Sequence, residues 1–234
     1  MIIRIIGILG LISLLHSPLS GQKERVKNRP YADLKPYYLG FGIGIHTQDL
    51  RLSNSGIMLP SGETLFAEVP EYRPGFHVGV LLGRVFRPGL ELRAMPTLYF
   101  GDKLVAYSNG TAEQSAFLMR STYLSVPLQL KYASLRLNNL RPYVATGLYG
   151  SLSLGGKRGE VLRERGLDYG LLFSIGCDLY LRYFTLSPEL TFGYGLPNII
   201  DLERKDLEDD KRIYYTQALR GGRTRMIALT LNFH

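Results

Sequence analysis

The segment GCDLYLRYFTLSPELTFGYG, residues 176–195, indicates how this chain folds. Apolar and polar residues alternate along both of its halves, and the alternation is interrupted near Arg182 and Tyr183. A period of two residues is typical of β-strands, so the segment predicts two antiparallel strands joined by a tight turn. One face would carry Cys177, Leu179, Leu181, Leu186, Leu190, Phe192 and Tyr194. The other would carry Asp178, Thr185, Ser187, Glu189 and Thr191. The fold then depends on which face meets water.

Composition favours an antiparallel β protein and excludes several other classes. The 234 residues include 26 Gly and 16 Tyr, with 45% hydrophobic residues, so the chain is not disordered. No internal stretch reaches the roughly 18 apolar residues that a membrane helix needs. The single cysteine, Cys177, excludes an intrachain disulfide. The net charge of +8 is scattered along the chain without a basic run, so no nucleic-acid partner is expected.

The N-terminus predicts export. Residues 1–21 have the pattern of a signal peptide: Arg4 precedes the apolar run 5–15, and cleavage is expected before Gln22. An uncleaved membrane anchor is the alternative. We expect a basic periplasmic tail over residues 22–36 and one folded domain over residues 37–234.

Eight segments of that domain show the same alternation as the hairpin. They are residues 37–47, 75–86, 90–100, 122–133, 142–154, 169–181, 184–194 and 224–233. Short turns at 87–89, 134–141 and 182–183 alternate with connections of about 27, 21, 14 and 29 residues, which is the rhythm of outer-membrane barrels. The longest connection contains DLERKDLEDDKR, residues 201–212, and is expected to be a solvated tip.

We therefore predict an all-β fold, an eight-stranded antiparallel transmembrane β-barrel of the bacterial outer membrane. One face is apolar in all eight segments, and a closed barrel satisfies every backbone hydrogen bond in lipid. The polar face would line the lumen, and an even strand number would leave both termini periplasmic. A secreted β-sandwich is the alternative. Pro96, Pro127 and Pro188 fall within predicted strands, where a bulge or a water molecule is expected at each.

Five charged residues share the inward phase in the periplasmic half of the predicted barrel. They are Glu91, Arg93, Lys131, Asp178 and Glu189. Eight strands leave an interior just wide enough for side chains, and inward glycines of the first two strands make room for larger polar groups. We interpret the five residues as a structural ion-pair plug. A proton or substrate relay is the alternative.

Two histidines, His46 and His77, point inward near the external mouth. No acid or cysteine is placed to complete a metal site with them, so we expect solvated or hydrogen-bonded lumen histidines. Ser53 and Ser125 have no partners that would make either a lipid-hydrolysing nucleophile. The residues thus predict no catalytic site, no metal and no cofactor.

Several segments resemble one family. TYLSVPLQLKYA (122–133), RPYVATGLYGSLSLG (141–155), DYGLLFSIGCDLYLRYFTLSPELTFGYGLPNI (168–199) and PYYLGFGIGIHTQDLRL (36–52) resemble the PorT/SprT-like outer-membrane β-barrel proteins of Bacteroidetes-type bacteria. The resemblance implies a component of the type IX secretion machinery, which exports proteins carrying a C-terminal signal domain. It implies other secretion-system membrane proteins as partners, beside outer-membrane lipid and lipopolysaccharide, and no catalytic residues. A stand-alone barrel of the adhesin or membrane-stability type and a lipid-modifying barrel enzyme are the alternatives.

Overall fold

The computed structural model describes residues 27–56, 64, 66–68, 73–108, 113–154, 165–201 and 218–234. The predicted signal peptide and all but the first residue of the acidic segment 201–212 lie outside the described residues. Among the described residues, no helix has the length and apolar character needed to cross a membrane.

One short helix and ten strands make up the described structure. The helix is the 3-10 turn η1 (Ala32–Leu34). The strands are β1 (Tyr37–Asn54), β2 (Phe66–Glu68), β3 (Pro74–Arg87), β4 (Leu90–Ala94), β5 (Thr97–Ser108), β6 (Glu113–Ala133), β7 (Leu140–Ser153), β8 (Leu167–Tyr180), β9 (Thr185–Gly195) and β10 (Leu219–Phe233).

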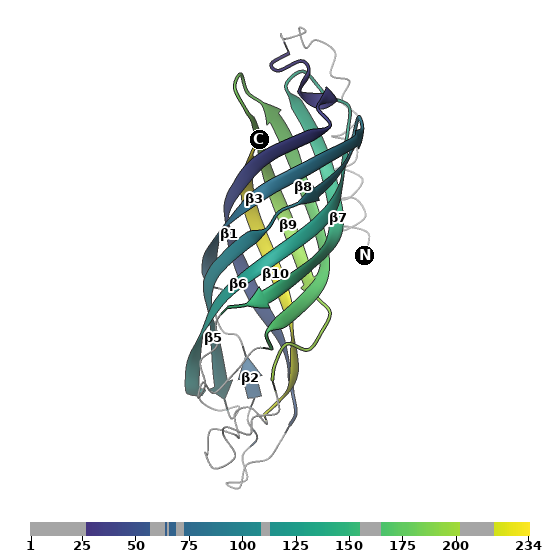
Figure 1. Ribbon diagram of the computed structural model, residues 1–234. Coiled ribbons are helices and arrows are strands. Elements are labelled where there is room, and N and C mark those ends of the chain that lie inside the picture. Colours follow the sequence, from purple (N-terminus) through teal and green to yellow (C-terminus); the bar gives the residue numbers. More distant parts are fainter. Residues whose placement is uncertain are drawn as a thin grey trace, which may run out of the picture.

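The strands close on themselves. β1 pairs with β3 on one side and with β10 on the other. β4 and β5 are two halves of one strand between β3 and β6, while β2 pairs with β5 outside the ring. β2 therefore lies outside the ring, and β4 and β5 together occupy one position in it. The ten strands thus form a closed antiparallel barrel of eight positions (Figure 1). The predicted fold class is confirmed.

The two faces of the wall differ in the way the alternation predicts. Ile45 and its register partner Leu229 point outward and are 58% and 48% exposed, whereas the next pair, His46 and Ala228, is buried at 3% and 2%. A continuous apolar outer band with polar residues inside reverses the pattern of soluble proteins. Lipid is the solvent that this outer wall fits.

Several strands continue beyond their predicted ends on the side of the long connections, which we call the loop side. β1 runs to Asn54 and β5 to Ser108, past the predicted ends at residues 47 and 100, while β6 and β10 start earlier than predicted. A small core holds this extension together at the lower end of Figure 1. It consists of Ala67, Val105, Tyr107, Ile200, Ala218 and Leu219, with Leu52 packed against it. The lipid-facing alternation ends before the strands reach this core, so it did not mark the true strand ends.

The prolines lie where the hydrogen-bond ladder is interrupted, without a register shift. Pro127 faces the break between β4 and β5, and its carbonyl oxygen accepts a hydrogen bond from the amide of Met95 at 3.2 Å. The carbonyl oxygen of Pro96 accepts from the amide of Val80 at 3.0 Å. Pro188 lies opposite a gap in the pairing of β8 with β9. The expected bulges are therefore absent at these three prolines, because the partner strand loses its pairing locally and keeps its register.

Candidate functional site: the barrel lumen and its turn-side mouth

The five predicted lumen residues lie together near the end of the barrel that carries the short turns, which we call the turn side. β4 supplies Glu91 and Arg93, β6 supplies Lys131, β8 supplies Asp178, and β9 supplies Glu189. All five are buried, at 6% exposure or less. The strand period fixes their inward direction, and the register between strands brings them to the same height.

Arg93 and Glu189 form the first of two ion-pair groups, and the Tyr143 ring lies beneath both Arg93 and Lys131 of the second group. The guanidinium Nη2 of Arg93 lies 2.7 Å from Oε2 of Glu189 and donates to Oε1 of Gln129 at 3.0 Å. Tyr143 donates its hydroxyl to Oε2 of Glu189 at 2.6 Å. Gln129 continues the network to the hydroxyl of Ser174 at 2.8 Å. Both charges are thus paired and hydrogen-bonded, as a buried ion pair requires, although Nε of Arg93 has no hydrogen-bond partner in the described structure.

Lys131 is the centre of the second group. Its Nζ lies 2.6 Å from Oδ2 of Asp178 and 3.4 Å from Oε2 of Glu91. Ser187 donates to Asp178 at 2.7 Å, and Tyr38 donates to Glu91 at 2.9 Å. The ammonium therefore holds two carboxylates: Ser187 occupies the other oxygen of Asp178, while Tyr38 shares Oε2 of Glu91 with Lys131.

Glycines make room for the tyrosines of this network. A side chain at Gly83 would overlap the ring of Tyr38. One at Gly176 would overlap the ring of Tyr143 and lie 2.8 Å from the carbonyl oxygen of Pro188. The prediction that inward glycines accommodate larger polar groups is confirmed at Gly83, in the second predicted strand.

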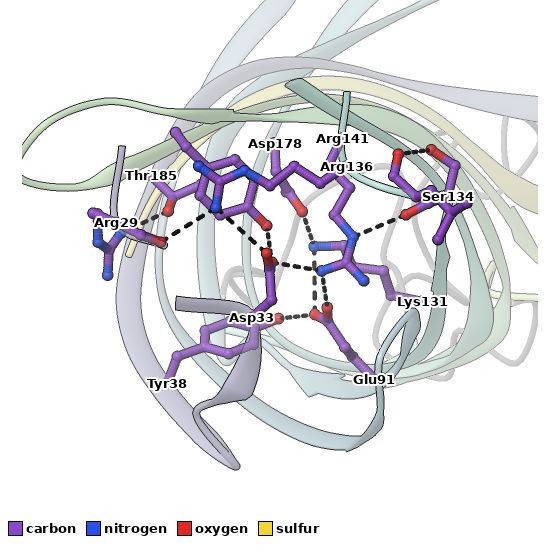
Figure 2. Close-up of polar contacts among 12 residues, drawn as sticks. Arg29, Asp33, Tyr38, Glu91, Lys131, Ser134, Arg136, Arg141, Asp178 and Thr185 are labelled. Carbon is purple, nitrogen blue, oxygen red and sulfur yellow. Dashed lines mark hydrogen bonds and ion pairs between the residues drawn. The ribbon is translucent and has the colours of Figure 1, made fainter. Parts of the chain in front are cut away.

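Residues 27–36, which we call the N-terminal cap, lie across the turn-side mouth. The carboxylate of Asp33 meets Arg141 Nη1 at 2.9 Å and Arg136 Nη1 at 3.4 Å (Figure 2). It also accepts a short hydrogen bond from the hydroxyl of Tyr180. Arg29 donates to the hydroxyl of Thr185 at 2.6 Å and to the carbonyl oxygen of His234 at 3.0 Å. The cap thus joins the turns and the C-terminus of its own barrel.

Arg141 connects the cap to the lumen. Its Nη1 lies 3.7 Å from Oε1 of Glu91 as well as near Asp33. Among the described residues the ion pairs of the lumen and the cap contain four acids and four bases, so their formal charges sum to zero. The acids are Asp33, Glu91, Asp178 and Glu189, and the bases are Arg93, Lys131, Arg136 and Arg141.

The sequence reasoning missed the cap and Arg141. Arg141 shares the inward phase of Tyr143, which was a usable signal, but Pro142 was taken as the start of that strand. Asp33 and Arg29 belong to no periodic segment, so no pattern pointed to them.

The predicted histidines lie in the loop-side half of the lumen. His46 and His77 are both buried, with ring centroids 5.6 Å apart, and each ring lies 4.9 Å from that of Tyr99. His77 Nε2 is 2.9 Å from the hydroxyl of Thr230. In the described part of the chain, no group of three or more His, Cys, Asp or Glu side chains is placed to hold a metal ion.

The lumen leaves little free space at this height. A cavity of about 20 Å³ beside Tyr99, Tyr123 and Tyr149 has room for about one water molecule. In this described part of the lumen the side chains therefore leave room for about one water molecule, and the cap covers the turn-side mouth.

An apolar outer wall, a closed antiparallel ring and a filled polar lumen define a small transmembrane barrel of the bacterial outer membrane. The family model of the outer membrane protein beta-barrel domain matches residues 22–201, more than three quarters of the chain. The chain belongs to this family.

Solved structures with a similar fold are small outer-membrane proteins. Neisserial surface protein A is 12% identical with a TM-score of 0.47, over 85% of this chain and 96% of its own. OprG from Pseudomonas aeruginosa is 12% identical with a TM-score of 0.48, over 83% and 94%. Ail of Yersinia pestis, solved with the heparin analogue sucrose octasulfate, is 9% identical with a TM-score of 0.36, over 83% and 96%. No curated protein matches the chain.

Proposed function

We propose that this outer-membrane barrel is a component of the type IX protein secretion machinery and acts through its surfaces, not as the conduit. The resemblance of four segments to the PorT/SprT-like family supports the secretion role. The filled lumen supports the second half of the proposal and is the observation that carries it. A barrel of eight strands has an interior that its own side chains fill, so cargo must cross the membrane elsewhere.

The proposal includes an orientation and a set of partners. Both termini and the short turns face the periplasm, and the long connections face outward, as in other outer-membrane barrels. The N-terminal cap and the turns then form a periplasmic surface, and the apolar wall contacts lipid and other membrane proteins of the secretion machinery. The barrel carries no catalytic role in this proposal.

Gene deletion tests the secretion role. We expect type IX cargo to accumulate in the periplasm with its C-terminal signal domain uncleaved, and the wild-type gene to restore export. Normal export by the deletion strain would contradict the proposal and favour a stand-alone barrel. Normal export together with an altered lipid A mass would favour a lipid-modifying enzyme.

Protease treatment of intact cells tests the orientation. Cleavage should occur within residues 201–212 and should spare Asn138 and Asn139, which lie in a short turn beside the cap. The same protease should reach the asparagine turn only after the outer membrane is opened. Cleavage at the asparagines in intact cells would reverse the orientation.

A further inference from the structure

A groove runs along the lipid-facing wall near the loop side of β8, β9 and β10. Its volume is about 710 Å³, and its apolar floor includes Leu171, Phe173, Phe192 and Ile227. These four side chains are 41–50% exposed on the outer wall. An apolar groove at this position fits a hydrocarbon chain, because these four side chains already face lipid.

Three arginines gather at the loop-side end of this groove. Arg225 is the register partner of Tyr194 on β9 and of Asp49 on β1, and its Nη2 lies 2.8 Å from Oδ2 of Asp49. One step further outward, Arg51 and Arg223 are register partners of each other. Arg223 donates to the hydroxyl of Tyr194 at 3.4 Å. The basic groups therefore lie where the apolar band ends, at the height of a lipid headgroup.

The charges of this group do not cancel. Like charges placed directly opposite each other on neighbouring strands destabilise a sheet. Asp49 is already paired with Arg225, and within the described part of the chain no carboxylate forms an ion pair with Arg51 or Arg223. All three arginines are exposed, so an anion from outside the chain can reach them.

We propose that this groove binds lipid A, with acyl chains along the apolar floor and a phosphate held by Arg51, Arg223 and Arg225. The guanidinium fork matches phosphate oxygens in geometry and charge, and basic sites beside a membrane-spanning wall bind lipid headgroups in this way. The site requires the outward orientation of the loop side, since lipid A occupies the outer leaflet. It does not require the secretion role, which the deletion strain tests separately.

Native mass spectrometry of the purified full-length barrel tests this site. The probes are bisphosphorylated lipid A, dephosphorylated lipid A and phosphatidylglycerol, each titrated into the protein in detergent. The variant Arg51→Gln/Arg223→Gln/Arg225→Gln should bind lipid A more weakly, by about a fivefold loss for each arginine. Dephosphorylated lipid A should show a comparable loss with the wild type.

A second triple variant is the control for charge. Arg84→Gln/Arg87→Gln/Arg182→Gln removes three exposed arginines from the turn side and should bind lipid A as the wild type does. Equal lipid A affinity of the groove variant and the wild type would overturn the proposal. Phosphatidylglycerol binding as tightly as lipid A would also overturn it, because the arginines would then be a general anionic-lipid surface. If the groove triple does not fold, Arg223→Gln alone should show the fivefold loss.

Discussion

Replacing Lys131 with methionine should destabilise the barrel strongly. The Lys131 side chain is 1% exposed, and its ammonium lies 2.6 Å from Asp178 and 3.4 Å from Glu91. Methionine keeps the unbranched stem but removes the charge, so Lys131→Met leaves two buried carboxylates without their shared cation.

The expected cost follows from burial. Removing one partner of a buried ion pair typically costs about 3–5 kcal/mol, because the other charge remains buried and unpaired. Ser187 and Tyr38 still donate to the two carboxylates, so we expect the lower end of that range. The matched control is Arg225→Met, because the Arg225–Asp49 pair has a similar distance of 2.8 Å but a half-exposed arginine. The Asp49 side chain is only 12% exposed, but water reaches the half-exposed guanidinium of Arg225 and screens the pair, so its loss should cost about 1 kcal/mol.

Urea unfolding in detergent measures the difference, with the folded fraction read from the faster migration of unheated protein on a denaturing gel. Tyrosine emission is a second readout, since the chain contains no tryptophan. Adding Asp178→Asn to Lys131→Met should recover part of the loss, because one of the two stranded charges is then removed. Equal unfolding midpoints for Lys131→Met and Arg225→Met would refute the buried network, since water would then be screening the lumen charges.

Three other predictions concern packing, the cap and pH. Gly176→Ala should destabilise the barrel by about 1–3 kcal/mol, because the new methyl group clashes with Tyr143. Gly150→Ala is the control, because its methyl group meets open space and should not change stability. Equal urea unfolding midpoints for the two variants would contradict the packing at Gly176. Asp33→Asn should increase the rate of tryptic cleavage at Arg29 and Lys35 by about fivefold, because a partly exposed ion pair that holds the cap is lost. The control variant Asp102→Asn should not change this rate. Unchanged cleavage of Asp33→Asn would mean that Asp33 does not hold the cap. Burial, with Lys131 nearby, lowers the pKa of His234 from 6.5 to about 4. As pH falls, the unfolded chain therefore binds a proton at His234 before the folded chain does, so the stability present above pH 6.5 is progressively lost toward pH 4. His234→Phe should lose less stability than the wild type between pH 7 and pH 5, measured by the unfolding midpoints at the two pH values.

The fold was predictable because one local signal is repeated eight times. Each segment alternates with a period of two, so the face of every inward residue follows from its position alone. The same signal failed at the strand ends. Tyr107 and Leu219 belong to a small core beyond the lipid band, where the outer face no longer has to be apolar.

The lumen cluster was predictable for the same reason, but the cap was not. Phase and turn positions place Lys131 and Asp178 inside the barrel at one height, and the structure joins them at 2.6 Å. Asp33 reaches Arg141 and Arg136 from a segment with no period, more than 100 residues away in sequence. Its place depends on a mouth that exists only once the barrel has closed.

The prolines show a feature that the alternation along a single strand cannot predict. The alternation assigns Pro96 and Pro127 to strands, but it does not show which neighbouring strand would have accepted a hydrogen bond from the amide that each proline lacks. Register supplies that answer: β4 and β5 pair with β6 on both sides of Met95 and Pro96, so the carbonyl of Pro127 and its absent amide face the same break. Pro96 instead faces β3, because its carbonyl oxygen accepts a hydrogen bond from the amide of Val80. The two prolines therefore lie beside one strand break but would have met different neighbouring strands, and the pairing keeps its register on either side. Single-strand patterns cannot predict this arrangement, because it depends on the alignment of segments about 30 residues apart.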